Sequence, residues 1–136
     1  MKFRYELVPS MVDGSLILQP RVLVKFTNPE NGRSITVNAL VDSGASISFL
    51  NIGLAEDLGV DLTAAPQEGV SSANKDDVVY YYDLEIHVQQ DPHEFIIPYG
   101  FMDFRTDAVV GQSGFFEHYR VVFERYRKTF ELTYHD

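Results

Sequence analysis

The sequence predicts an all-β domain of many short strands, interrupted by one or two short helices. Apolar and polar residues alternate along several segments, so the dominant hydrophobic period is two and not 3.6. Residues that favour turns separate these segments. The chain has 136 residues, of which 45% are hydrophobic, and this is enough for a core. Because no repeat, linker or low-complexity tract divides the chain, we predict a single domain over residues 1–136.

The clearest predicted hairpin joins the segments RVLVKFT (21–27) and SITVNALV (34–41). In each segment, every second side chain is apolar, which is typical of a half-buried strand. Pro29 and the pair Asn31-Gly32 lie between them and favour a turn. The two apolar faces consist of Val22, Val24 and Phe26, and of Ile35, Val37, Ala39 and Val41.

Further strands are predicted at 78–88 and 94–102. The first alternates apolar and polar residues, and the second contains Pro98, which indicates a sheet edge or a bend. A second hairpin is predicted within 119–134, where the charged stretch ERYRK separates two apolar strands.

Two segments have helix signals. NIGLAEDLG (51–59) begins with Asn51, a good N-cap, and ends with Gly59, a common helix terminator. QSGFFEHY (112–119) predicts a turn or two of helix after Ser113.

Composition excludes several function classes. The formal net charge is -9 and the sequence pI is about 4.7, which argues against a nucleic-acid partner. The basic cluster of Arg125, Arg127 and Lys128 is interpreted as a solvated hairpin turn. The chain has no cysteine, so disulfides and thiolate chemistry are excluded. We expect no metal and no cofactor, because no metal-binding spacing links the histidines His87, His93, His118 and His135.

The N-terminal segment MKFRYELVPS lacks the apolar core of a signal peptide. No run in the chain approaches the roughly 18 apolar residues that a membrane span needs. We therefore predict a cytoplasmic protein that has no membrane partner.

Asp42 is the strongest candidate for chemistry. It follows an apolar strand and begins the turn Asp-Ser-Gly-Ala, and strand parity places it on the face opposite to Val41. Gly44 and Ala45 keep side-chain bulk away from the backbone, so its N–H groups can bind a carboxylate or a peptide. The apolar residues that follow, Ile47, Phe49 and Leu50, would return the chain to the core.

The Asp-Ser-Gly triplet alone is weak evidence for a catalytic site. An Asp followed by Ser or Thr and then Gly arises by chance in about one chain of this length in twenty. Its apolar flanks strengthen it, and so does a second feature, the segment AVVGQSGFF, in which Val109 and Val110 precede Gly111. Taken alone, that segment could simply be a buried strand that ends at a glycine.

In this order, the two segments resemble the retropepsin-like aspartic proteases, the single-domain family that includes the retroviral proteases. The resemblance rests on LVDSGA at 40–45 and VVG at 109–111, and it covers most of the chain from Val22 onward. It implies a small closed β-barrel with a flap hairpin over the substrate cleft. It also implies an aspartic endopeptidase that acts on extended polypeptides without a cofactor.

By the same resemblance, Asp42 would be the catalytic carboxylate, Ser43 would brace the active-site loops, and Gly44 would supply backbone hydrogen bonds. The flap would lie within 68–82 and have its tip in 70–75. The residues expected to contact substrate are Ala45, Ser46, Val70, Ser71, Ser72, Ala73, Ala108 and Val109.

The chain departs from the family pattern at two places. The predicted flap tip is not rich in glycine, and Ser46 stands where retroviral members have an acidic residue. Only one Asp-Ser-Gly is present, so the second acid would come from another copy in a homodimer. The terminal segments could form an intersubunit sheet, or the C-terminal hairpin could pack within its own subunit.

Two other interpretations stay open at this point. The chain could be a peptide-binding or dimerisation module that keeps the fold without catalysis, as the serine-containing flap and Ser46 suggest. It could also be a β-barrel domain that shares the Asp-Ser-Gly turn by coincidence.

Overall fold

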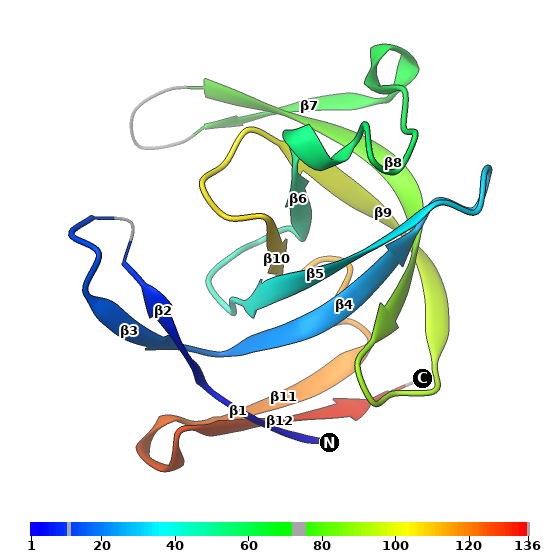
Figure 1. Cartoon of the computed structure of the whole chain (residues 1–136). Coiled ribbons are helices and arrows are strands. Elements are labelled where there is room, and N and C mark those ends of the chain that lie inside the picture. The colour runs from blue at the N-terminus through cyan, green and yellow to red at the C-terminus, as the bar shows by residue number, and fades with distance from the viewer. Residues whose placement is uncertain (11, 72–75, 136) are drawn as a thin grey trace.

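The computed structural model describes residues 1–10, 12–71 and 76–135 and has the predicted all-β architecture (Figure 1). Three short 3₁₀ helices are the only helices in these ranges. The helices are η1 (Ile52–Leu54), η2 (Leu62–Ala64) and η3 (Arg125–Arg127). The strands are β1 (Lys2–Arg4), β2 (Glu6–Pro9), β3 (Leu16–Gln19), β4 (Arg21–Thr27), β5 (Ser34–Val41), β6 (Phe49–Asn51), β7 (Gln67–Ser71), β8 (Asp76–Val88), β9 (Glu94–Met102), β10 (Ala108–Val110), β11 (Tyr119–Glu124) and β12 (Thr129–Tyr134).

Six strands form a closed barrel in the order β4-β5-β10-β6-β9-β8, and β4 and β8 pair with each other to close it. β7 extends the sheet beyond β8. β10 lies between β5 and β6, parallel to the first and antiparallel to the second. The segment after β5 and the segment after β10 therefore emerge together from the same end of the barrel, since parallel neighbours end at the same edge.

The predicted strand faces form the core. Val22, Val24 and Phe26 on β4 are 0–1% exposed, and the side chains between them face outward. On β8 the same alternation buries Leu84, Ile86 and Val88. The apolar period of two thus gives each barrel strand one buried face and one outer face.

The chain termini pair within the chain. β12 is the central strand of a second sheet in the order β1-β12-β11. The rings of Phe3 and Phe130 stack with centroids 5.4 Å apart. Both edges of β12 are therefore paired within the same chain. This arrangement corresponds to the second of the two alternatives given above, in which the C-terminal hairpin packs within its own subunit.

The helix predictions were partly wrong. In 51–59, Asn51 caps a helix by accepting from the N–H of Gly53 at 3.0 Å, but the helix is 3₁₀ and covers only Ile52–Leu54. In 112–119 the structure has turns instead of a helix. Gly114 has a φ of +92°, which lies outside the right-handed helical region and prevents a continuous helix.

A buried carboxylate joins the barrel to the C-terminal sheet. Asp91, in the β8–β9 turn, is 4% exposed, and it accepts hydrogen bonds from the Tyr119 hydroxyl and from the His93 N–H and ring Nδ1. Burial raises the pKa of Asp91, but these hydrogen bonds outweigh burial and lower the pKa below its usual value. The His93 ring also stacks on Tyr134, with centroids 3.8 Å apart.

Candidate active site

Asp42 stands where β5 ends and the turn 42–46 begins. Val41 points into the core and is 2% exposed, whereas Asp42 points the other way and is half-buried. The backbone N–H of Asp42 donates to the carbonyl oxygen of Val110 at 3.0 Å. The carboxyl group is therefore carried by two paired barrel strands and stays accessible to solvent.

Hydrogen bonds within the turn orient this carboxylate. The N–H of Gly44 donates to Oδ1 of Asp42 at 2.9 Å, and the N–H of Ala45 donates to the backbone oxygen of Asp42 at 3.2 Å. A Cβ at position 44 would lie 3.2 Å from the same Oδ1. Glycine lets the backbone approach the carboxylate, and a hydrogen bond to an ionised oxygen is stronger than a neutral one.

The segment after β10 holds the turn from the other side. The N–H groups of Gln112 and Ser113 donate to the carbonyl oxygens of Ala45 and Ser46 at 2.9 and 3.0 Å. The side-chain Nε2 of Gln112 donates to the carbonyl oxygen of Ser43 at 2.7 Å. The two segments that the sequence analysis paired are thus in direct contact, and Gln112 is a site residue that it missed.

Gly111 and Ser48 make this close contact possible. A Cβ at Gly111 would lie only 2.4 Å from the Ile47 carbonyl oxygen and 2.7 Å from that of Ala45. The hydroxyl of Ser48, which is 3% exposed, accepts from the Gly111 N–H at 2.8 Å and donates to the Ser113 carbonyl at 2.8 Å. Sequence reasoning missed Ser48, although a lone serine between Ile47 and apolar residues was a signal for a buried hydrogen bond.

Tyr99 supports the same region from β9. It is fully buried, and its hydroxyl donates to the carbonyl oxygen of Val109 at 2.7 Å. Burial raises the pKa of Tyr99 well above its usual value, so the hydroxyl stays protonated and acts as a donor. Nothing in the local sequence distinguished this tyrosine from the others.

A small apolar cluster lies behind the turn. It consists of Phe49, Val79, Met102 and Val109, and it is separate from the main core. Ala45 and Ile47 pack against it. Of the two β10 residues predicted to line the cleft, Val109 belongs to this cluster and Ala108 is buried in the main core. The side chains of Ser43 and Ser46 are exposed on the turn.

The predicted flap segment contains a β-hairpin. β7 and β8 pair antiparallel from Gln67 opposite Tyr80 to Ser71 opposite Asp76. Val70 and Ser71 therefore lie at the end of β7 (Figure 1). The other two predicted contact residues, Ser72 and Ala73, lie outside the described residues.

Among the described residues, no three histidine, aspartate or glutamate side chains gather as a group that could hold a metal ion. None of the helices in these ranges has the length and apolar character needed to cross a membrane. The cytoplasmic location expected from the sequence stays a prediction.

A protein-family model described as aspartyl protease matches residues 24–103. The match covers more than half of the chain and includes Asp42 with the turn that follows it. A search of curated proteins finds no match.

Solved structures with a similar fold include a retropepsin-like aspartic protease from Rickettsia conorii. It is 18% identical, has a TM-score of 0.60, and the match covers 94% of this chain and 98% of that one. Another is the retroviral protease-like domain of Ddi1 from Leishmania major, with 18% identity, a TM-score of 0.53, and coverage of 83% and 88%. At this level of identity, the likeness establishes the fold alone.

Proposed function

Because the chain belongs to the aspartyl protease family and has the retropepsin-like fold, we propose that it is an aspartic endopeptidase that hydrolyses internal peptide bonds of extended polypeptides. One observation carries the proposal: Asp42 is accessible on a turn whose backbone is fixed from both sides. A carboxylate held in this way is preoriented for chemistry.

The active site needs two copies of the chain. The sequence contains a single Asp-Ser-Gly and no Asp-Thr-Gly, whereas an aspartic protease uses two carboxylates within hydrogen-bond distance of each other. Two copies related by a two-fold axis would bring Asp42 of one protomer against Asp42 of its partner. We therefore propose a homodimer in which the dyad forms only on association.

The β2–β3 hairpin offers a surface for this association. Leu7 and Leu16 are 62% and 64% exposed, and a two-stranded hairpin with exposed leucines gains stability when a partner covers it. In Figure 1 the hairpin extends from the barrel at the left of the view, which is also the side on which β5 ends.

The proposed mechanism uses the shared proton of the dyad. Two carboxylates this close cannot both ionise easily, so the pair holds one proton over a wide pH range. The ionised carboxylate takes a proton from water, whose oxygen attacks the peptide carbonyl carbon. The protonated carboxyl donates a hydrogen bond to the carbonyl oxygen and stabilises the tetrahedral intermediate. The carboxyl that took the proton from water then gives it to the amide nitrogen, and collapse of the intermediate breaks the C–N bond.

Other residues have positioning and binding roles in this proposal. Ser43 braces the two active-site turns, and Gly44 holds the carboxylate through its N–H. Substrate would lie as an extended strand between the turn and the β7–β8 hairpin, with main-chain hydrogen bonds and alternate side chains in pockets. On the turn side, Ala45 and Ser46 are the proposed contacts, and on the hairpin side the proposed contacts are Val70, Ser71, Ser72 and Ala73. Ala108 and Val109 are 0% and 2% exposed, so their proposed role is to support the cleft from beneath.

A non-catalytic peptide-binding module is the second candidate. The observation that favours it is Ser46, which is exposed on the turn where retroviral members have an acidic residue. In such a module, Asp42→Asn would leave peptide binding intact and no cleavage would occur at any pH.

The test is incubation of the purified protein with a mixed peptide library between about pH 4 and 7, followed by mass spectrometry of the products. We expect cleavage by the wild-type chain and by Asp57→Asn, a matched change at an aspartate outside the turn. We expect no cleavage by Asp42→Asn. Cleavage that survives Asp42→Asn contradicts the proposal, and absence of cleavage by every variant favours the binding module.

A further inference from the structure

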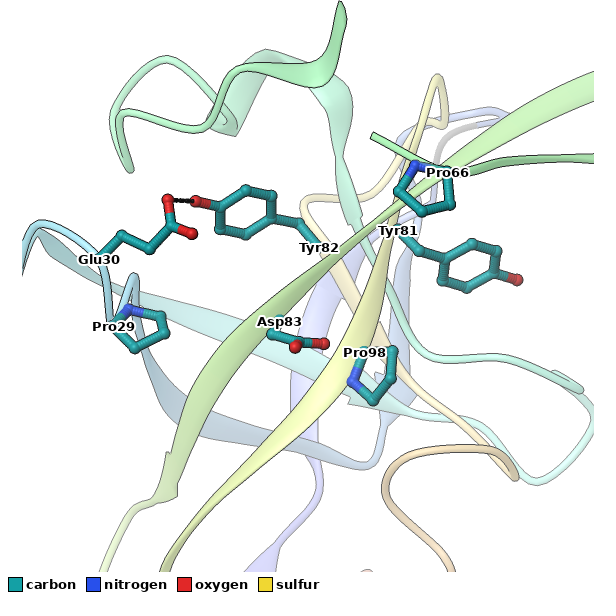
Figure 2. Close-up of a pocket in the computed structure, with 7 residues that line it drawn as sticks. All are labelled: Pro29, Glu30, Pro66, Tyr81, Tyr82, Asp83 and Pro98. Atoms are coloured by element: carbon teal, nitrogen blue, oxygen red, sulfur yellow. Dashed lines mark hydrogen bonds between the residues drawn. The ribbon is translucent and has the colours of Figure 1, made fainter. Parts of the chain in front are cut away.

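Figure 2 shows a pocket in the barrel wall that contains no residue of the active-site turn 42–46. Tyrosine and proline rings form most of its walls, and two carboxylates also line it. In Figure 2 the carboxyl group of Glu30 meets the Tyr82 hydroxyl, and that of Asp83 points toward Pro98. The lining residues are Pro29, Glu30, Pro66, Tyr81, Tyr82, Asp83 and Pro98.

The pocket exists because the pairing along β8 is interrupted. β7 pairs with β8 only up to Tyr80, and β4 pairs with β8 only from Glu85 onward. Between these positions, residues 81–84 pair with β9 on one edge. On the other edge, the N–H of Tyr81 donates to the carbonyl oxygen of Pro66 at 2.9 Å, and no described strand pairs with residues 82–84. Pro29 and Pro66 flank this gap, and neither has an N–H with which to close it.

The two charged residues that line the pocket, Glu30 and Asp83, are both acidic. None of its lining residues is basic, and an adjoining pocket that shares Glu30 and Tyr82 adds Asp61. The hydroxyl of Tyr82 donates to Oε2 of Glu30 at 2.5 Å, which fixes the carboxylate beside the ring (Figure 2). The hydrogen bond to Glu30, burial, and the charges of Glu30 and Asp83 together raise the pKa of Tyr82.

The proline and tyrosine rings are the second feature of the pocket that could recognise a ligand. The side chains of Pro29, Pro66 and Pro98 are exposed, whereas Tyr81 and Tyr82 are half-buried. Tyrosine faces attract cations, and apolar rings pack well on the methylene stem of a lysine or arginine. An open groove of this composition suits a long cationic side chain on an extended backbone better than it suits an anion or an apolar ligand.

We propose that this pocket is an exosite that binds the lysine or arginine side chain of an extended polypeptide segment. The carboxylates of Glu30 and Asp83 attract the cation, and its stem lies against the proline and tyrosine rings. The pocket would then recruit a basic segment of a polypeptide outside the catalytic cleft. Binding of a basic segment does not depend on the proposed protease function. The further step, that the bound polypeptide is a substrate for cleavage at Asp42, rests on that function.

The test is a binding titration by two-dimensional NMR of the full chain. The probes are the blocked peptides acetyl-Pro-Arg-Pro-amide and acetyl-Pro-citrulline-Pro-amide, which have the same shape and differ in charge. We expect the arginine peptide to shift the amide signals of Glu30 and of residues 81–84 and to bind at least about fivefold more tightly than the citrulline peptide. Equal binding of the two peptides, or signal changes confined to other regions, would overturn the proposal.

Two double variants with the same loss of charge separate a specific site from general attraction to an acidic protein. Glu30→Gln with Asp83→Asn should weaken arginine-peptide binding at least about fivefold. Asp103→Asn with Glu131→Gln, at positions outside the pocket, should leave binding within about twofold. Equal weakening in both double variants contradicts the exosite. Because no cleavage is measured, failure of the exosite leaves Asp42-dependent proteolysis unaffected, and failure of proteolysis leaves the binding result interpretable.

Discussion

Gly111 is the residue on which the geometry of the turn 42–46, the candidate active-site turn, depends most directly. Its missing side chain lets the backbone after β10 pass within contact distance of the Ile47 and Ala45 carbonyl oxygens. Its N–H also donates to the buried Ser48 hydroxyl. Steric fit therefore requires glycine at this position, whereas the hydrogen bond requires only a residue with a backbone N–H.

We predict that Gly111→Ala destabilises the fold by about 1–3 kcal/mol, because the added methyl group would collide with backbone oxygens that cannot move independently. Urea unfolding followed by circular dichroism measures the change. Gly69→Ala is the matched control, since a Cβ at position 69 meets nothing within 4 Å. Equal stability of the two variants would show that the turn is not packed against Gly111 as described.

Some residues of the site could be predicted from the sequence and others could not. Asp42, Gly44 and Gly111 belong to short motifs whose local chemistry is visible in sequence. Ser48 and Gln112 contribute through partners more than 60 positions away, Gly111 and Ser43. Such contacts depend on how the chain folds back, so neither propensity nor strand parity indicates them.

At the scale of elements, the strands were predicted better than the helices. A period of two is repeated over seven or eight residues in β4 and β5 and identifies the buried face clearly. The segment 112–119 has helix-compatible residues, but Ser113 pairs in parallel with Ile47 and Gly114 adopts a positive φ. A tertiary bridge and one glycine conformation override the local helix preference there.

The C-terminal sheet is joined to the barrel by the bonds of Asp91, and this predicts a pH dependence of stability. The folded-state pKa of Asp91 is lowered, so its contribution is present above the unfolded pKa of about 3.9 and is lost as the pH falls through the folded value. Tyr119 and His93 bind the carboxylate, and His87 contacts the backbone oxygen of Asp91 at 2.6 Å.

We predict that Asp91→Asn destabilises the protein by about 1–3 kcal/mol at pH 6, and that the difference from wild type shrinks as the pH falls below about 4. Thermal and urea unfolding across this pH range measure the difference. Asp103→Asn, which removes an exposed carboxylate, should show neither effect. A constant difference between wild type and Asp91→Asn at all pH values would contradict the proposed ionic role.

At the scale of the whole molecule, the closure of the barrel could not be predicted from the residues alone. β4 and β8 lie some sixty positions apart in sequence, and their registered pairing, with Val24 opposite Val88, has no local sequence signal. Only the family resemblance implied a closed barrel. The same resemblance linked the segments LVDSGA and VVG. The structure places both at one end of the barrel, because β5 and β10 are parallel neighbours.

The central claim is that one active site is shared by two copies of the chain, and subunit mixing tests it most directly. Wild-type chain and Asp42→Asn are mixed in equal amounts, unfolded and refolded together, and assayed for cleavage of a peptide identified from the library. If the dyad requires both Asp42 carboxylates, only about a quarter of the dimers are active. Activity should then fall to roughly a quarter of that of the same total amount of wild type. A fall to only about half would mean that each chain carries a complete site, and would contradict the shared dyad.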